Sequence, residues 1–257
     1  MSRSKTRDGL VCYVLAAGNA RRTGYLGSLL PKTLLPVRGQ PLLWHSLLTA
    51  SQLGARRVVV VTRPRWRVIR ASVNEFSLKG TNLKEVRTVF LRSSTAGPVE
   101  TLLRVLPRAP DDFCVVLGDD FTKGNNVGAL GEALRDREVV AAELVVRDDI
   151  PERIKQACEV RLTSGGRIES ILEKPRRPSG NLRGCGVYFF RGKAFSGLLS
   201  IAGRSGRPMS MTDLVAAATR SKAAASVLLD GVNVNVNTLA DYVSVLTIEG
   251  TNVDQPL

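Results

Sequence analysis

The segment from Val11 to Val37 combines residue types that suit the binding of a polyphosphate. It begins with a short run rich in β-branched residues, Val11 to Leu15, which is typical of a buried strand. The small residues Ala16 to Gly18 follow and would let a ligand approach the backbone closely. Two arginines come next, the second of them Arg22, and Lys32 lies ten positions further on. Because backbone N–H groups and fixed positive charges can face one anion in such a turn, the segment predicts a polyphosphate site. A generic Rossmann turn is the competing interpretation, but neither G-x-G-x-x-G nor G-x-x-x-x-G-K-[ST] is present.

A second polar group follows the apolar run Phe113 to Leu117, which predicts another buried strand. This run leads directly into Gly118, Asp119 and Asp120. A carboxylate at the carboxyl end of a parallel strand lies where open α/β sheets bind their ligands. Carboxylate oxygens are also the donors that Mg²⁺ prefers, which makes Asp119 a candidate metal ligand and Asp120 a weaker one. The alternative role is a helix cap or a turn residue, which is common after strands.

These two segments resemble the signature of the sugar-1-phosphate nucleotidylyltransferases. That signature reads L-A-[AG]-G-x-G-[TS]-R, then nine residues ending in Pro, then K-x-L-L-P-V. Arg22 and Lys32 stand at the family's arginine and lysine with the spacing kept, and L-G-D at 117–119 matches the family's metal-binding motif. Two positions depart from the pattern, since Ala20 replaces the second glycine and Arg21 replaces the small Thr or Ser.

The sequence I-L-E-K-P-R-R-P-S-G-N-L-R-G-C-G-V-Y-F-F carries the strongest motif of the second half of the chain. It is similar to the family's E-K-P, an Asn eight residues after the Glu, and a G-[LIV]-Y-F strand. Glu173, Lys174, Asn181 and Gly186 match in order and spacing. The resemblance implies that Glu173 accepts hydrogen bonds from sugar hydroxyls and that Lys174 holds the sugar's phosphate. Without it, Glu173 and Lys174 would be an ordinary exposed ion pair.

Three further segments resemble the family with substitutions. The loop of residues 92–100 matches the base-selecting loop, in which Gly97 fits the A-G step, but the glutamine of thymidylyl members is missing, which leaves the base open. Ser210 replaces the Glu of the family's E-I-T-D segment, so the acceptor could differ from that of relatives. Aligning the segment of residues 231–242 on Thr238 and Asp241 puts Asn235 at the family's second metal ligand. An amide oxygen is a weaker Mg²⁺ ligand, and a turn residue is the alternative.

The alternation of predicted strands and helices indicates an α/β fold with a doubly wound, mostly parallel, Rossmann-like sheet in three α/β/α layers. From residue 139 the strands follow one another more closely, and the resemblance implies a small inserted β-rich sugar-binding region. We expect one nucleotidylyltransferase domain over 1–257, with a nucleotide-binding core at 8–138, the sugar-binding region at 139–212 and a return to the core at 213–250. Helices are predicted at 41–53, 66–76 and 210–220 and through 102–106, and strands at 58–61, 86–91, 139–146, 159–162, 167–171 and 186–190, with a strand and then a helix between 232 and 245.

Composition narrows the classes of protein. The chain of 257 residues can bury a substantial core, and no apolar run approaches the length needed to span a bilayer. Residues 1–8 lack the apolar centre of a signal peptide, and the four cysteines have no C-x-x-C spacing, so we expect buried free thiols in a cytoplasmic protein. The net charge of +14 comes from scattered arginines with only 5% aromatic residues, which makes nucleic-acid binding an unfavoured interpretation. The single histidine, His45, is expected to be structural.

The resemblance implies a Mg²⁺-dependent nucleotidylyltransferase that condenses an NTP with a sugar-1-phosphate to give an NDP-sugar and pyrophosphate. Two alternatives remain: the same chemistry on a cyclitol, polyol or phosphonate phosphate, and a catalytically silent module of this fold used in regulation. A homo-oligomer is also an open alternative. The predicted catalytic residues are Arg22, Lys32 and Asp119; the nucleotide-binding residues Leu15, Ala16, Ala17, Gly18, Arg22 and Gly97; the substrate-binding residues Gly118, Glu173, Lys174 and Asn181; and the metal ligands Asp119 and Asn235.

Overall fold

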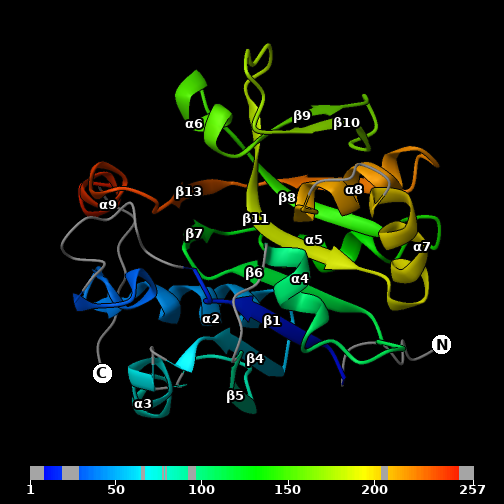
Figure 1. Cartoon of the computed structure of the whole chain (residues 1–257). Coiled ribbons are helices and arrows are strands. Elements are labelled where there is room, and N and C mark those ends of the chain that lie inside the picture. The colour runs from blue at the N-terminus through cyan, green and yellow to red at the C-terminus, as the bar shows by residue number, and fades with distance from the viewer. Residues whose placement is uncertain are drawn as a thin grey trace.

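A mixed sheet of nine strands organises the chain (Figure 1). The computed structural model describes residues 9–18, 29–64, 67–76, 78, 80–91, 97–203 and 208–248. The strands of this sheet are β1 (Val11–Leu15), β4 (Arg57–Thr62), β5 (Glu85–Phe90), β6 (Phe113–Leu117), β8 (Ala141–Arg147), β9 (Cys158–Leu162), β10 (Ile168–Glu173), β11 (Leu182–Phe190) and β12 (Ala224–Leu228). Among the described residues, no helix is both long enough and apolar enough to cross a membrane.

The centre of the sheet is four parallel strands in the order β5-β4-β1-β6. Alternate side chains of β1 enter two separate apolar layers, with Cys12 and Val14 on one face and Tyr13 and Leu15 on the other. Helices cover both faces, which explains why these strands read as continuous apolar runs. The first face packs against α2 (Leu42–Gln52), α3 (Arg67–Glu75) and α5 (Ala129–Ala133), and the second against α4 (Pro98–Leu103), α7 (Gly192–Ala202) and α8 (Met211–Thr219). The predicted three-layer α/β fold is therefore confirmed.

Strand β11 joins the parallel centre to the β-rich segment. It runs antiparallel to β6 and also pairs with β8 and β9, while β10 pairs with β9 and β12 with β8. Together with α6 (Pro151–Gln156), β9 and β10 stand above the central strands in Figure 1. The predicted turn between β9 and β10 forms at Gly166, whose φ of 76° explains the glycine. The boundaries expected at residues 139 and 212 stay a prediction.

A small two-stranded sheet of β7 (Asp120–Gly124) and β13 (Gly231–Asn235) lies beside the end of β6. Helix α9 (Leu239–Leu246) follows, and β2 (Pro36–Val37) and β3 (Gln40–Pro41) form a hairpin after the short 3₁₀ helix η2 (Lys32–Leu34). His45 is buried beside this sheet, with Nε2 2.9 Å from the carbonyl of Val37 and its ring against Phe121. These contacts agree with the structural role expected for His45.

Several element boundaries differ from those predicted. The helix predicted through residues 102–106 is α4, which begins earlier, at Pro98, and ends at Leu103. The earlier start has a physical reason, since Gly97 is the N-cap and proline suits the first helical position. Strand β11 begins four residues before the predicted Gly186. Strands β7 and β12 were not predicted. The β7 sequence D-F-T-K-G begins with Asp120, for which a cap or turn was the alternative to a metal ligand, and it becomes a strand by pairing with distant β13.

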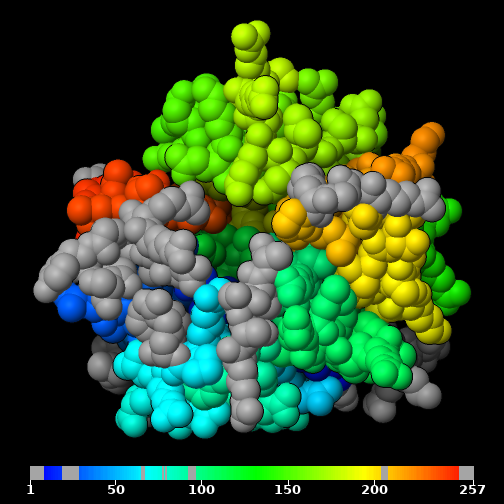
Figure 2. Space-filling model, viewed as in Figure 1, coloured from blue at the N-terminus to red at the C-terminus, as the bar shows by residue number. Residues whose placement is uncertain are grey.

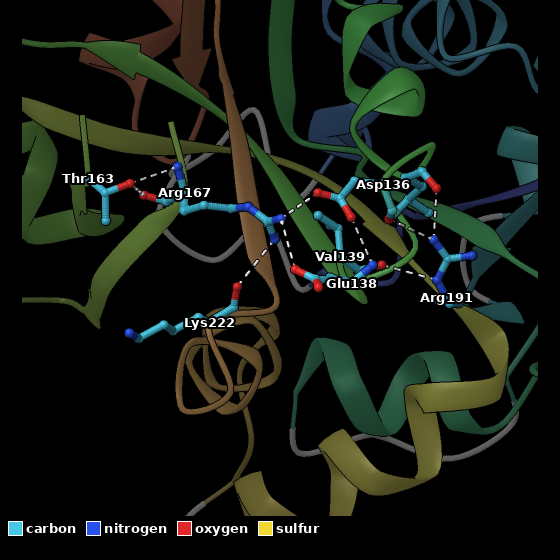
Figure 3. Close-up of polar contacts among 8 residues, drawn as sticks. Asp136, Glu138, Val139, Thr163, Arg167, Arg191 and Lys222 are labelled. Carbon is cyan, nitrogen blue, oxygen red and sulfur yellow. Dashed lines mark hydrogen bonds and ion pairs between the residues drawn. The ribbon is translucent and has the colours of Figure 1, made fainter. Parts of the chain in front are cut away.

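Two arginines fasten the segment before β8 to the rest of the sheet (Figure 3). Arg167 forms an ion pair with Asp136 and donates to the carbonyl of Lys222 at 3.2 Å. Arg191 donates to three backbone carbonyls, those of Leu134, Asp136 and Val139, at 2.8–3.2 Å. The planar guanidinium group can reach several acceptors at once, so Arg191 fixes the chain where it leaves α5 and enters β8.

We expect Arg191→Lys to lower the free energy of unfolding by about 1–2 kcal/mol, because a lysine ammonium group cannot serve the three carbonyls in the same plane. Urea unfolding followed by circular dichroism would measure this. Arg135→Lys is the control, since Arg135 has a highly exposed side chain on the same segment and its change should cost less than about 0.5 kcal/mol. Equal losses in the two variants would contradict the assigned role of Arg191.

Candidate active site

Two adjoining cavities lie at the carboxyl ends of β1 and β6. The first, of about 290 Å³, is lined by the turn after β1, by Lys32 and by the start of α4. The second, of about 390 Å³, is lined by residues of β7, β8, β10, β11 and the segment after β13. Gly97, Pro98, Leu117 and Asp119 line both cavities. Figure 2 shows this face hollowed between the part that carries β9 and β10 above and α4 below.

The first cavity brings together the predicted nucleotide-binding residues that the structure describes: Leu15, Ala16, Ala17, Gly18 and Gly97. The turn after β1 is fixed by hydrogen bonds from the Ala16 amide to the Val61 carbonyl (2.8 Å) and from the Gly118 amide to the Leu15 carbonyl (3.0 Å). A Cβ atom at Gly118 would lie 3.1 Å from that Leu15 carbonyl oxygen, so Gly118 permits the close approach of the two strand ends without lining either cavity. Arg22 lies outside the described residues, and its role stays a prediction.

Lys32 and Asp119, both predicted to be catalytic, meet at the boundary of the two cavities. The Lys32 ammonium group forms an ion pair with Asp119 Oδ2 and donates to Asn237 Oδ1 at 3.2 Å. Only 10% of the Lys32 side chain and 25% of the Asp119 side chain is exposed, so this charge pair is poorly screened by water. Asn237 was not predicted, although the alternation in V-N-V-N-V-N places Asn233, Asn235 and Asn237 at every second position.

Asp119 and Asn235, the predicted metal ligands, both line the second cavity. The Val236 amide donates to the Asp119 carbonyl at 2.9 Å, which holds the end of β13 beside the end of β6. Asp120 lies opposite Asn235 in the β7–β13 pair, and its buried Oδ2 has no hydrogen-bond partner among the described residues. Burial, and then the charge of Asp119, raises the pKa of Asp120 well above its usual value.

These oxygen donors suit a hard divalent cation such as Mg²⁺. Within the described ranges, no group of three or more His, Cys, Asp or Glu side chains could hold a metal ion. Mg²⁺ does not need such a cage, since proteins commonly hold it through one or two carboxylates together with substrate phosphates and water. The partnerless oxygen of Asp120, the carboxylate of Asp119 and the amide of Asn235 therefore fit the ion by their chemistry.

A buried arginine holds the β7–β13 sheet against β11. Arg183 Nε donates to Asp148 Oδ2 at 2.7 Å, and Arg183 Nη2 donates to the Asn233 carbonyl at 2.6 Å. The Asn233 side chain in turn donates to Thr122 Oγ1 at 2.9 Å. A buried guanidinium group needs such partners, and its network fixes the strand that carries Asn235 two residues further on.

Glu173 and Lys174 line the second cavity as well. Lys174 follows β10 in the left-handed conformation with φ of 46°, and its amide donates to the Ala157 carbonyl at 2.8 Å. Its ammonium group lies 3.7 Å from Glu173 Oε1, and 65% of the side chain is exposed. Asn181 does not line the described cavity, and its side-chain amide donates to Asp149 Oδ1 at 3.4 Å. Its substrate role stays a prediction.

Glu143 is a cavity residue that the sequence reasoning missed. It lies within β8, its side chain is fully buried, and it lines the second cavity together with Cys158 and Tyr188. Burial, and then the charge of Glu173, raises the pKa of Glu143 to about 8. The sequence held one signal, a single carboxylate inside the apolar run A-A-E-L-V-V. Glutamate is rarely buried in such a strand unless it has a partner or a function.

A parallel α/β sheet with a cation and carboxylates at its strand ends is the arrangement of proteins that bind phosphorylated ligands. Residues 12–171 match the family described as MobA-like NTP transferase domain. The UTP–glucose-1-phosphate uridylyltransferase AglF of Haloferax volcanii is 30% identical over 177 residues, which cover 69% of this chain and 70% of the relative. A glucose-1-phosphate thymidylyltransferase of Xanthomonas campestris is 26% identical over 188 residues, which cover 70% of this chain and 60% of the relative.

Solved structures share the fold. A UDP-glucose pyrophosphorylase complexed with UDP-glucose superposes with a TM-score of 0.73 and 18% sequence identity, over 93% of this chain and 97% of that chain. The chain therefore belongs to the MobA-like NTP transferase family and is a nucleotidyltransferase with sugar-1-phosphate nucleotidylyltransferases among its relatives.

The raised pKa of Glu143 predicts a pH dependence of stability. Folded Glu143 keeps its proton up to about pH 8, whereas the carboxyl group of an unfolded chain loses it near 4.5. Between these values the folded state binds more protons, so this contribution is complete below pH 4.5 and is lost as the pH rises through 8. The full loss is on the order of 5 kcal/mol, of which about 4 kcal/mol falls between pH 5 and 8.5.

Denaturant unfolding from pH 5 to 8.5 would test this with Glu143→Gln, which cannot titrate. The unfolding free energy of Glu143→Gln relative to the unmodified protein should rise with pH by about 4 kcal/mol. Glu169→Gln is the control, because Glu169 is exposed on β10 and outside the cavities. A difference between Glu143→Gln and the unmodified protein that stays constant with pH would contradict the prediction.

Proposed function

We propose that this protein transfers the nucleotidyl group of an NTP to a sugar-1-phosphate and releases pyrophosphate. The observation that carries the proposal is the pair of adjoining cavities that share Asp119, with Lys32 at their boundary. One cavity has the small-residue turn that suits a nucleotide, and the other holds Glu173 and Lys174. The printed activities of the uridylyltransferase and thymidylyltransferase relatives support the same reaction class.

The reaction brings two anions together, so the main task of the site is neutralisation and alignment. A phosphate oxygen of the acceptor forms a bond to the α-phosphorus, and the bond from that phosphorus to the bridging oxygen of the β-phosphate breaks. The electron pair of the broken bond leaves with pyrophosphate. No general base is required, because the attacking oxygen is already anionic.

The cations take separate parts in this proposal. Lys32 stabilises charge at the α-phosphate from the boundary of the cavities, and Arg22 grips the leaving phosphates. Lys174 places the acceptor phosphate in line, while Glu173 accepts hydrogen bonds from the acceptor's hydroxyl groups. In the structure Lys32 is paired with Asp119, so binding of the substrates would have to exchange that partner for phosphate oxygens.

Asp119 and Asn235 would hold Mg²⁺, with Asp120 beside them. When bound, the ion neutralises phosphate charge and draws charge from the oxygens around the α-phosphorus. Asp119 would then exchange Lys32 for the ion, which would release the Lys32 ammonium group to the phosphate oxygens.

The acceptor is less closely defined than the chemistry. Ser210, at the N-cap of α8, lines the second cavity and forms a capping box with Asp213. Serine is shorter than the glutamate of the family's E-I-T-D segment, so the wall of the second cavity differs at this position. This difference favours nucleotidyl transfer to another phosphorylated acceptor as the second candidate function. A cytoplasmic location and a homo-oligomeric state stay predictions.

Asp119→Asn and Lys32→Met should each lower kcat by about 10²–10³-fold, because both remove charge at the reacting phosphorus. Arg22→Ala should also cost mainly kcat. Coupled detection of pyrophosphate, with a panel of NTPs and sugar-1-phosphates, would measure this. Asp111→Asn is the matched control, since Asp111 is exposed just before the opposite end of β6 and should change kcat less than about twofold. Unaltered turnover of Asp119→Asn and Lys32→Met would contradict the roles given to these residues.

Removal of divalent ions with a chelator should abolish activity, and added Mg²⁺ should restore it. Asn235→Asp should lower the half-saturating Mg²⁺ concentration by about three- to tenfold, because a carboxylate binds the ion more strongly, and Asn235→Ala should raise it. Asn82→Asp, an exposed change before β5, should leave the Mg²⁺ dependence as it was. A Mg²⁺ titration that is the same in all of these variants would exclude Asn235 as a ligand.

A further inference from the structure

Glu143 places a buried carboxyl group in the wall of the second cavity, at a position that the proposed transfer does not use. Its side chain is fully buried, and its Oε2 atom has no hydrogen-bond partner among the described residues. The Cys158 thiol, a weak donor, lies 3.8 Å from Oε1. A carboxyl group with a partnerless oxygen is costly inside a protein, so the cavity wall is polar at a point where an apolar side chain would be more stable.

The backbone around Glu143 leaves room for this carboxyl group. A Cβ atom at Gly184 would overlap Glu143 Oε1 and would lie 2.7 Å from Cys158 Sγ. The strand β11 therefore carries a glycine directly beneath the carboxyl group. Gly184 lines the second cavity as well. Glu143 and the glycine that leaves room for its carboxyl group therefore belong to the wall of the same cavity.

The other charges on this cavity are mostly negative. Asp119, Asp120, Glu143 and Glu173 line it, whereas Lys174 is the lysine in the described lining and its mostly exposed ammonium group lies beside Glu173. Asp119 has Lys32 as a partner, and Asp119 and Asp120 lie at the proposed Mg²⁺ site. Glu143 has no cation partner among the described residues, and the donors beside its carboxyl group are the Cys158 thiol and the Tyr188 hydroxyl group. A ligand group that supplies positive charge would satisfy it, since buried carboxylates are stable when paired.

We propose that the acceptor is a phosphate that carries a primary ammonium group, and that this group binds to Oε2 of Glu143. The inference rests on the proposed nucleotidyl transfer and narrows its acceptor. An amino sugar phosphate and a small amino alcohol phosphate share this chemistry. In either one the phosphate lies toward Lys174, and the ammonium group lies beside Glu143 and Tyr188 in the same cavity.

A neutral Glu143 that donates a hydrogen bond to a hydroxyl group is the competing arrangement. It would favour neutral sugar phosphates, and changing Glu143 to Gln would preserve it, because the Gln amide also donates. An ammonium group, in contrast, lowers the pKa of Glu143 when it binds and so ionises this carboxyl group, and that counter-charge is lost in Glu143→Gln. The variant therefore separates the two arrangements without a change in side-chain size.

Pyrophosphate release would be measured with matched acceptors at saturating NTP and Mg²⁺. Glucose 1-phosphate would be compared with analogues in which one hydroxyl group, at position 2, 3, 4 or 6, is replaced by an amino group, and 2-hydroxyethyl phosphate with 2-aminoethyl phosphate. At least one amino acceptor should have kcat/KM about tenfold or more above that of its hydroxyl counterpart. A preference within the hexose series would identify an amino sugar phosphate, and one for 2-aminoethyl phosphate an amino alcohol phosphate.

Glu143→Gln should reduce that preference by about tenfold or more while changing kcat/KM for the hydroxyl counterpart by less than about threefold. Glu169→Gln, the exposed control on β10, should leave the preference unchanged. The proposal is overturned if no amino acceptor exceeds its hydroxyl counterpart, or if the preference is the same in Glu143→Gln. Release of pyrophosphate with a hydroxyl acceptor would still uphold the proposed function, whereas no release with any NTP and acceptor would refute the transfer itself.

Discussion

The ion pair between Lys32 and Asp119 is the contact on which the site depends. The two residues are 87 positions apart, and they meet at the carboxyl ends of the adjacent parallel strands β1 and β6. Asp119 follows β6, and the side chain of Lys32, the first residue of η2, lies against Gly18 after β1. The pair is largely shielded from water, so its charges act over short distances with little screening. It also marks the boundary of the two cavities, because Asp119 lines both and Lys32 lines the first.

The surrounding structure keeps buried polar groups at this edge of the sheet, although the burial of each one lowers the stability of the folded protein. Arg183 holds the strand that carries Asn233 and Asn235, and its own charge is satisfied by Asp148. Gly186 has φ of 67°, and a Cβ atom there would overlap the Asp120 carboxylate, so only a glycine allows this carboxylate to lie where it does. Stability is given up here for the position of charged groups, as is common at sites that bind and transform ligands.

The sequence predicted the parts of the fold that local pattern determines. The run V-C-Y-V-L and the Gly18 turn were interpretable without the structure because β-branched runs and small residues have local meaning. Residues that act through distant partners were missed. Strand β7 exists through its pairing with β13, and Asn237 matters because it accepts a hydrogen bond from Lys32. Glu143 could be noticed as a charge in an apolar strand, but its cavity is formed by strands that pair far along the chain.

The central claim is that one product molecule spans both cavities, with its two phosphates beside Lys32 and Asp119. A crystal structure of the protein with an NDP-sugar and Mn²⁺, which has an anomalous signal, would test it most directly. We predict the base in the cavity beside Ala16 and Gly18, the glycosyl group beside Glu173, and the anomalous peak between Asp119 and Asn235. A ligand bound elsewhere, or a metal peak away from these two side chains, would contradict this account.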